Sequence, residues 1–236
     1  MSRIDRLMFE SMMRDDHDMA FERSHDAYWS GDRAHGWFDA FENRFTNSYQ
    51  KNFPDFVDAI VGCANDSNNR LSHIVEVGTA TGDAIAYFSS VLDQSFDYLG
   101  LDISDKAVAR ARDRWERTPC SFETARVQDW VQRSLEPGTM MLAFGGVFEY
   151  LRPEQFLIVA EQLRARAPSV LVLLEPIADG TDPSTQDEAV LHGSELTYAH
   201  PFVRILSSLG FEMRWKRTAD INGTKMLQLI AVRNLD

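Results

Sequence analysis

The sequence predicts an α/β protein, with a doubly wound, mostly parallel sheet that follows a helical segment. Three observations support this prediction. Short apolar runs alternate with amphipathic helical segments from about residue 70 onward. The last two apolar runs are joined by an Asn-Gly turn, which is typical of an antiparallel hairpin. Aromatic residues recur at helical spacing in the first third of the chain.

The first third is predicted to be a helical cap. Trp37, Phe38, Phe41 and Phe45 fall on one stripe of a helix. The polar, turn-forming run Asn65–Asn69 then breaks the pattern. We therefore expect a cap over residues 1–68 and an α/β domain over residues 69–236. The aromatic-rich cap is also a candidate contact between the two copies of a homodimer.

The α/β domain is predicted to contain five strands and then a hairpin. Ser104 is a good N-cap for the helix after the second strand, and Pro153 begins the helix after the fourth. The fifth strand is almost wholly apolar, as expected for a strand buried on both faces. The strands are expected at residues 73–78, 96–102, 121–127, 139–146 and 169–176, and the hairpin at 211–217 and 225–233.

Composition limits the classes of function. The chain has 236 residues and a formal net charge of −12, which disfavours a nucleic-acid partner. No apolar run approaches the roughly 20 residues of a membrane span, and residues 1–16 do not read as a secretory signal. The two cysteines, Cys63 and Cys120, show no metal-ligand spacing. We expect a cytoplasmic protein without a membrane partner or a metal site.

The stretch VEVGTATGDA, Val75–Ala84, joins the first predicted strand to its helix. A glycine-rich turn here lets backbone amides approach a ligand at a helix N-terminus. Dinucleotide-binding proteins have glycines at the first, third and sixth positions of this turn. The chain has Gly78, Ala80 and Asp83 there, which disfavours a nicotinamide or flavin enzyme.

The pattern Glu76-x-Gly78-x-x-x-Gly82 resembles the first motif of class I S-adenosylmethionine-dependent methyltransferases, acid-x-Gly-x-Gly-x-Gly. Ala80 stands in place of the middle glycine. The resemblance covers about residues 70–236. It implies a Rossmann-like seven-stranded sheet, S-adenosylmethionine as cofactor and S-adenosylhomocysteine as product. By resemblance, Glu76 helps to hold the methionine end of the cofactor, and the backbone of Gly78, Thr79 and Gly82 packs against it.

Further cofactor contacts follow from the same resemblance. Asp102, at the end of the second strand, matches the acid that binds the ribose hydroxyls, and Ile103 would cover the adenine. Asp129 matches an acid that accepts from the adenine amino group, and Trp130 would flank the ring. The alternatives are that Asp102 caps a helix and that Asp129 is an exposed loop acid.

The acceptor is expected to be a small molecule. Methyltransferases that act on base amines carry (Asp/Asn)-Pro-Pro-aromatic after the fourth strand, but this chain has FGGVFEYL at Phe144–Leu151. Cys120 precedes the third strand, so it does not match the nucleophile of cytosine methyltransferases. O-methylation is slightly favoured. N- or C-methylation, or a non-catalytic binding protein that keeps the fold, are the alternatives.

Transfer to a hydroxyl requires removal of its proton, and histidine is the usual base. His200 begins the helix before the hairpin and is our first choice, although a purely structural role there is nearly as well supported. Glu149 and Tyr150 follow the fourth strand and are expected to orient the acceptor. The remaining expected acceptor contacts are Tyr28, Trp29, His35, Glu175, His192 and Tyr198.

Overall fold

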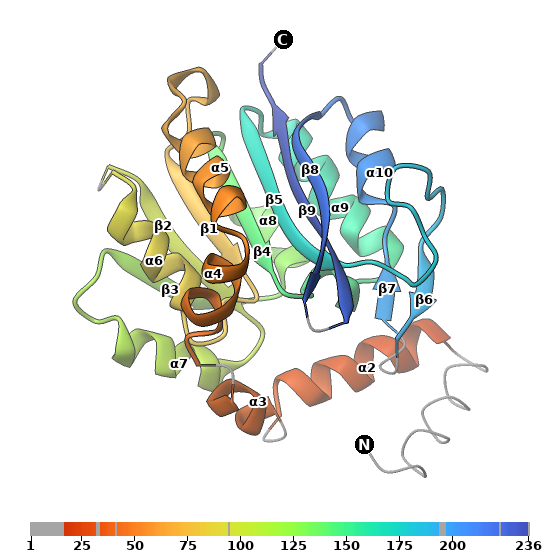
Figure 1. Cartoon of the computed structure of the whole chain (residues 1–236). Helices are drawn as coiled ribbons and strands as arrows, with labels where there is room; N and C mark the ends of the chain where they lie inside the picture. The colour runs from red at the N-terminus through yellow and green to blue at the C-terminus, as the bar shows by residue number, and fades with distance from the viewer. Residues whose placement is uncertain are drawn as a thin grey trace.

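The computed structural model describes residues 17–31, 34–40, 42–93, 95–193, 197–221 and 223–235. These residues form a seven-stranded sheet in the order β3-β2-β1-β4-β5-β9-β8 (Figure 1). Strand β9 runs against both of its neighbours, and the other pairs are parallel. The predicted fold, including the C-terminal hairpin, is confirmed. The strands are β1 (His73–Val77), β2 (Asp97–Asp102), β3 (Cys120–Thr124), β4 (Thr139–Phe144), β5 (Ser169–Pro176), β8 (Glu212–Ile221) and β9 (Thr224–Arg233).

Helices cover both faces of the sheet, because alternate residues of each strand point to opposite sides. Ile74 of β1 packs with α5, α6 and α7, whereas Val75 and Val77 pack with α8, α9 and α10. All eight residues of β5 are buried, as its apolar sequence predicts. The helices are α5 (Pro54–Asn65), α6 (Asp83–Val91), α7 (Asp105–Arg114), α8 (Val127–Ser134), α9 (Pro153–Ala165) and α10 (Phe202–Ser208), with short turns η3 (Ser67–Asn69) and η4 (Phe148–Tyr150).

Part of the expected cap belongs to the α/β core. Phe56, Val57 and Ile60 of α5 are buried in the same cluster as Ile74 and Met140 of the sheet. Helix α5 therefore packs on the sheet, and the boundary at residue 68 stays a prediction. The helices before α5 are α2 (His17–Trp29), α3 (His35–Ala40), the π-helical turn η2 (Phe45–Tyr49) and α4 (Gln50–Asn52).

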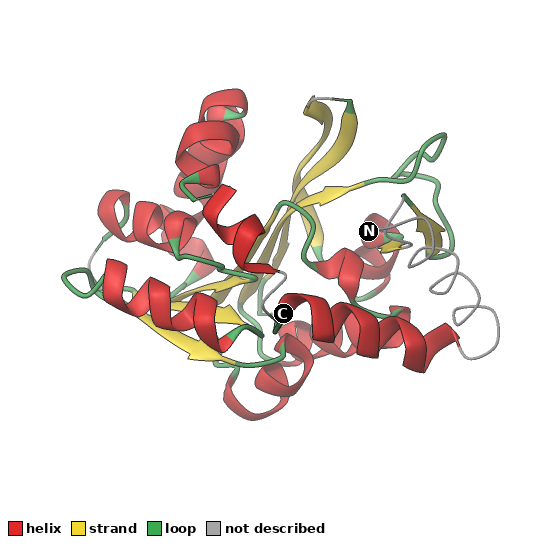
Figure 2. Cartoon of the chain, turned by 90° about the horizontal axis from the view of Figure 1, so that it is seen from below, coloured by secondary structure: helices red, strands yellow, loops and turns green. Residues whose placement is uncertain are grey.

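Helix α2 lies across the carboxyl ends of the parallel strands, as Figure 2 shows from that side. A second difference from the sequence prediction lies after β5. There the chain forms a small antiparallel pair, β6 (Val190–His192) and β7 (Thr197–Ala199), close to η4. Both features bring side chains to the carboxyl edge of the sheet.

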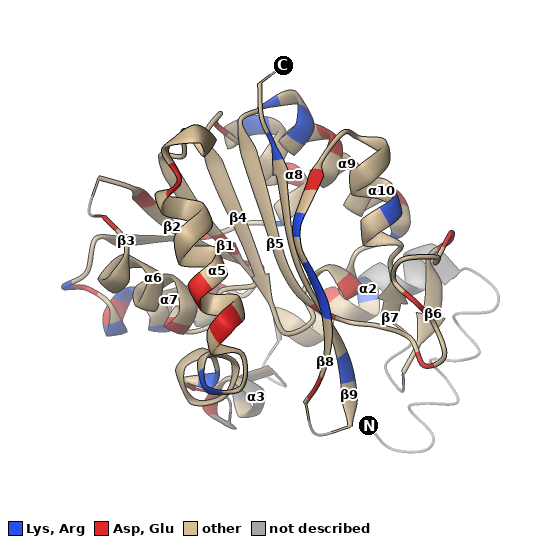
Figure 3. Cartoon of the chain, turned by 45° about the horizontal axis from the view of Figure 1, so that its top comes forward, with Lys and Arg blue, Asp and Glu red and all other residues tan. Residues whose placement is uncertain are grey.

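Charged residues lie on several helices and on the hairpin strands β8 and β9, whereas β4 carries none (Figure 3). None of the described helices is long and apolar enough to cross a membrane.

Candidate functional site

The strand register brings three loops together at the carboxyl edge of the sheet. Val77, the last residue of β1, pairs with Leu101 of β2 and with Ala143 of β4. The strand order also reverses here: β2 and β3 lie on one side of β1, and the next strand in the chain, β4, lies on the other side. Ligands of open α/β sheets bind at such a switch point. A cavity of about 570 Å³ lies there.

The loop after β1 keeps the tight turn that its glycines predict. Gly78 has φ +68°, and a Cβ atom on it would lie 2.7 Å from Val147 Cγ2. Ala80 has φ +47°, the left-handed conformation that normally favours glycine. Alanine at the place of the motif's middle glycine therefore preserves the turn. Gly78 and Ala80 both line the cavity.

Glu76 and Thr79 support this loop from behind. Glu76 Oε2 accepts hydrogen bonds from Thr79 Oγ1 (2.7 Å) and from the Ile85 backbone N–H (3.0 Å). Burial raises the pKa of Glu76 to about 8, although both hydrogen bonds act in the opposite direction. Neither residue is among those that line the cavity. The structure thus gives them a bracing role in place of the expected direct contact.

Gly82 is explained by packing. Its φ is +79°, and a Cβ atom there would lie 2.7 Å from Phe122 and 2.8 Å from Trp115. These aromatic rings occupy the side of the turn that faces β3, and Gly82 does not line the cavity. The resemblance led us to expect that Gly82 contacts a ligand, but here the glycine contacts two aromatic rings of the protein.

Asp102 and Ile103 both line the cavity, as expected. Asp102 is 9% exposed, and its two carboxylate oxygens accept from the backbone N–H groups of Ala80 and Ser104, each at 2.9 Å. Burial raises the pKa of Asp102, against these hydrogen bonds. Ser104 caps α7 with its own hydroxyl, which accepts from the Ala107 N–H. Asp102 is therefore not needed as the side-chain cap.

Asp129 and Trp130 lie outside the cavity because β3 is shorter than predicted. The strand ends at Thr124, and α8 begins at Val127, so both residues are helical. Asp129 is exposed, and Trp130 is buried in the core between α8 and the sheet. The cavity is lined at this point by the four preceding residues, Ala125, Arg126, Val127 and Gln128.

A polar cluster lies where β4 and β5 end. Glu149 Oε2 accepts from Thr197 Oγ1 at 2.6 Å and lies 3.7 Å from His192 Nε2. Burial lowers the pKa of His192, against the carboxylate of Asp179, so the imidazole is neutral at neutral pH. Glu149, His192 and Thr197 line the same cavity as Asp102. Sequence reasoning proposed the first two and missed Thr197.

Glu175 holds this cluster in place. It is fully buried at the end of β5, and it accepts from the backbone N–H groups of Val147, Phe148 and Glu149 at 2.9, 3.0 and 3.3 Å. Burial, and secondly the charge of Glu149, raise the pKa of Glu175 to about 8. Its side chain does not line the cavity, so its contribution is to fix η4.

His200 and Tyr198 are packed into the protein rather than exposed to the cavity. His200 is 3% exposed, with Nε2 at 2.9 Å from the Phe148 carbonyl and 3.1 Å from the Leu151 carbonyl. Its ring packs against Tyr198 and Phe156. Burial lowers the pKa of His200 to about 4. Since neither residue lines the cavity, the structure does not support His200 as the base or Tyr198 as an acceptor contact.

Helix α2 covers the cavity with an aromatic face. The rings of Trp29 and His25 lie 5.3 and 5.0 Å from the ring of Tyr150, and all three line the cavity. Tyr28, whose ring lies 4.9 Å from the ring of Trp29, is 38% exposed and does not line the cavity. The side chain of His35 lies outside the described residues. Trp29 and Tyr150 thus keep their expected position, and Tyr28 does not.

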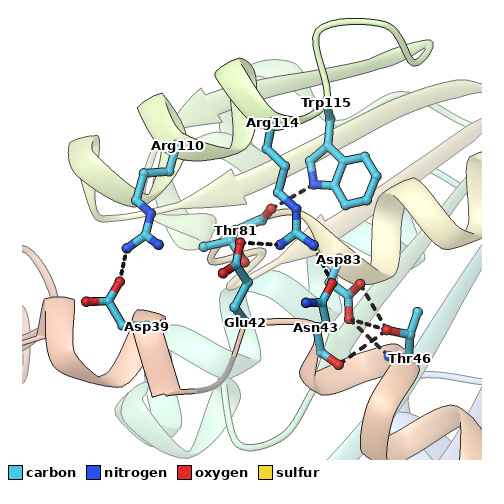
Figure 4. Close-up of polar contacts among 9 residues, drawn as sticks. All are labelled: Asp39, Glu42, Asn43, Thr46, Thr81, Asp83, Arg110, Arg114 and Trp115. Atoms are coloured by element: carbon cyan, nitrogen blue, oxygen red, sulfur yellow. Dashed lines mark hydrogen bonds and ion pairs between the residues drawn. The ribbon is translucent and has the colours of Figure 1, made fainter.

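Polar contacts fasten the segment between α2 and α5 to α7 and to the first residue of α6 (Figure 4). Asp39 pairs with Arg110 of α7 at 2.5 Å. Asp83, the acid that follows the glycine turn, accepts from the Thr46 backbone N–H at 3.0 Å and from its hydroxyl at 3.3 Å. Further links in the same region are Glu42 and Asn43 with Arg114, and Trp115 Nε1 with the Thr81 carbonyl. This segment therefore has a fixed position above the cavity.

Several lining residues were not predicted. Arg44 and Tyr49 reach the cavity from the fastened segment, and Gly145 and Gly146 line it just after β4. The glycine pair at the end of the predicted strand 139–146 was a usable signal, because glycine permits close approach of other groups to the backbone. The hairpin contributes Ile221, Thr224 and Met226.

No protein-family model and no curated protein matches the sequence. Solved structures do match the fold. The magnesium protoporphyrin IX methyltransferase from Synechocystis PCC 6803, with bound S-adenosylmethionine, is 16% identical with a TM-score of 0.64, over 91% of this chain and 97% of the other. The N-methyltransferase NodS from Bradyrhizobium japonicum WM9 is 13% identical with a TM-score of 0.56, over 83% and 99%. The glycopeptide N-methyltransferase MtfA, complexed with sinefungin, is 12% identical with a TM-score of 0.50, over 72% and 84%. The chain therefore has the fold of S-adenosylmethionine-dependent methyltransferases.

Proposed function

We propose that this protein is a methyltransferase that transfers the methyl group of S-adenosylmethionine to a hydroxyl group of a small molecule. One observation carries the proposal. A single cavity joins the residues expected to bind the cofactor, Gly78, Asp102 and Ile103, to a second polar cluster that contains Glu149 and His192. A cofactor and an acceptor bound in one cavity can be brought into the contact that transfer requires.

The lining residues fit this cofactor. The volume, about 570 Å³, lies within the range of roughly 300–1,000 Å³ of small-molecule sites. The Asp102 carboxylate has about four acceptor sites, and backbone N–H groups of Ala80, Ser104 and Ile103 interact with it. Acceptor capacity remains for a ribose hydroxyl. Leu101, Ile103 and Val127 form an apolar wall beside it that suits a purine ring.

The acceptor is expected beside β4 and β5. In the sheet order β2-β1-β4-β5, the proposed ribose site at Asp102 lies at the end of β2, and Glu149 of the Glu149–His192 pair follows β4. Trp29 and Tyr150 enclose the cavity with aromatic faces, which favours an acceptor with a planar or apolar body. The cover that α2 and Tyr150 form over the cavity supports a small molecule over a polymer.

His192 is proposed as the base. Its imidazole is neutral at neutral pH because burial lowers its pKa, so a ring nitrogen is able to accept a proton from a hydroxyl. The neighbouring Glu149 carboxylate stabilises the imidazolium that results, at 3.7 Å. S-adenosylmethionine, when bound, supplies a methyl group already activated on a sulfonium. The protein's own contribution is alignment, exclusion of water by α2 and removal of the proton.

Calorimetric titration tests the proposal. The protein is titrated with S-adenosylmethionine, with S-adenosylhomocysteine and with NAD as a negative control. We expect micromolar binding of the first two and none of NAD. Hydroxyl-bearing aromatic compounds are then screened for consumption of S-adenosylmethionine. Failure to bind either sulfur ligand refutes the proposed function.

A further inference from the structure

Tyr49 carries a buried polar atom that the fold itself does not use. The residue ends the π-helical turn η2, is 4% exposed and lines the cavity. Its hydroxyl makes no hydrogen bond within the part of the chain that the structure describes. An unsatisfied buried hydroxyl is costly, and one that faces a cavity calls for a ligand as its partner.

The backbone at the end of β4 is shaped around this hydroxyl. A Cβ atom on Gly145 would lie only 2.0 Å from Tyr49 Oη, and Gly145 has φ +82°. The Gly145 N–H donates to the Leu174 carbonyl at 2.8 Å, which fixes the backbone at this point. The hydroxyl therefore lies against the end of β4, between the ribose site over β1 and β2 and the Glu149–His192 pair.

The surroundings of the hydroxyl suit the electron-poor end of a ligand. Burial raises the pKa of Tyr49 to about 12, so the side chain is a neutral phenol whose oxygen retains lone pairs. Among the nearby charges, that of Arg44 lowers this pKa, and those of Glu175 and Glu149 raise it. Arg44 lies over the ring, with its guanidinium carbon 5.1 Å from the ring centroid.

We propose that the Tyr49 hydroxyl oxygen contacts the sulfonium and methyl group of bound S-adenosylmethionine and positions that methyl group toward the acceptor. The inference rests on the proposed function and assigns one residue within it. S-adenosylhomocysteine has neither the positive charge nor the methyl group. The contact therefore distinguishes the cofactor from the product, and it favours release of the product after transfer.

The test is the Tyr49→Phe variant, which removes one oxygen and keeps the ring. Affinities for S-adenosylmethionine and S-adenosylhomocysteine are measured by calorimetry. We expect the first to fall about tenfold, as for loss of a contact to a charged group, and the second to change less than twofold. Tyr87→Phe is the matched control, because Tyr87 packs against Phe45 in the same region but does not line the cavity.

Each outcome decides the inference. An equal loss for both ligands would mean that Tyr49 contacts the amino-acid or ribose part that they share, and this would overturn the assignment. Unchanged affinity for both would overturn it as well. Wild-type protein that binds neither ligand would refute the proposed function itself, a distinguishable result. If thermal melting shows that Tyr49→Phe does not fold, Gly145→Ala, which displaces the hydroxyl, is measured in the same way.

Discussion

The most direct test of the cofactor site is the substitution Asp102→Asn. In the free protein each carboxylate oxygen of Asp102 accepts one backbone N–H, from Ala80 and from Ser104, at 2.9 Å. The amide has only one acceptor oxygen, so one of these N–H groups would face an NH₂ group. The variant also loses one charge-assisted bond to a ribose hydroxyl.

The expected effect on affinity follows from that geometry. Loss of one hydrogen bond to a charged group costs about 1.5–3 kcal/mol, which corresponds to roughly 10- to 150-fold weaker binding. Calorimetry with S-adenosylhomocysteine measures this directly, because the ribose is the same in both ligands. Urea unfolding of the free variant, at the temperature of the titration, establishes that the variant is folded in the comparison.

Asp129→Asn is the matched control. It makes the same chemical change on an exposed residue of α8 that does not line the cavity. We expect its affinity to equal that of the wild type. Folded Asp102→Asn that binds within twofold of the wild type would remove Asp102 from the ribose site. An equal loss of affinity in Asp129→Asn would show that Asp129 of α8 also contributes to cofactor binding.

Three further predictions concern the base, the loop and the fastened segment. The kcat/KM of the wild type should fall as the pH drops through the depressed pKa of His192. His192→Gln should lower the rate about 10²–10⁴-fold and abolish this pH dependence. His73→Gln, at the far end of β1, is the control and should change neither the rate nor its pH dependence. Because the pKa of Glu76 is raised to about 8 in the folded state, the neutral form is favoured there, and the unfolding free energy should decrease by up to about 1.4 kcal/mol per pH unit between pH 4.5 and 8. Urea titrations at pH 5 and 8 should show a flatter dependence for Glu76→Gln, and an unchanged slope would contradict the assignment. Asp83→Asn should destabilise the protein by about 1–2 kcal/mol more than the control Asp105→Asn, which changes an exposed acid in the first turn of α7. Equal melting temperatures of the two variants would show that the contact of Asp83 with Thr46 contributes nothing to stability.

Local patterns were sufficient for the architecture. The alternation of apolar runs and amphipathic segments depends on the periods of strands and helices, and these are properties of neighbouring residues. The wholly apolar β5 and the Asn-Gly turn before β9 indicated a central strand and an edge hairpin, and both are present. The glycine motif also indicated the correct loop, since backbone conformation at Gly78 is a local requirement.

Sequence position did not decide which motif residues face the cavity. Glu76 points into the protein because its carboxylate accepts hydrogen bonds from Thr79 and from the start of α6, three and nine residues later in the chain. Asp129 lies on an exposed helical face because β3 ends three residues earlier than predicted. The burial of His200 depends on the carbonyl groups of Phe148 and Leu151, about 50 residues earlier in the chain, which a local pattern does not reveal.

The sequence by itself determined the class of fold and the alternation of strands and helices, because these follow from local periodicity. It also predicted the loop at which a ligand would bind, from the pattern of its glycines. The tertiary structure decided which side chains meet at that loop. Tyr49, Gly145 and His192 come from separate segments and share no sequence pattern. Their proximity results from long-range packing and from the contact of Thr46 with Asp83, which holds Tyr49 above the end of β4.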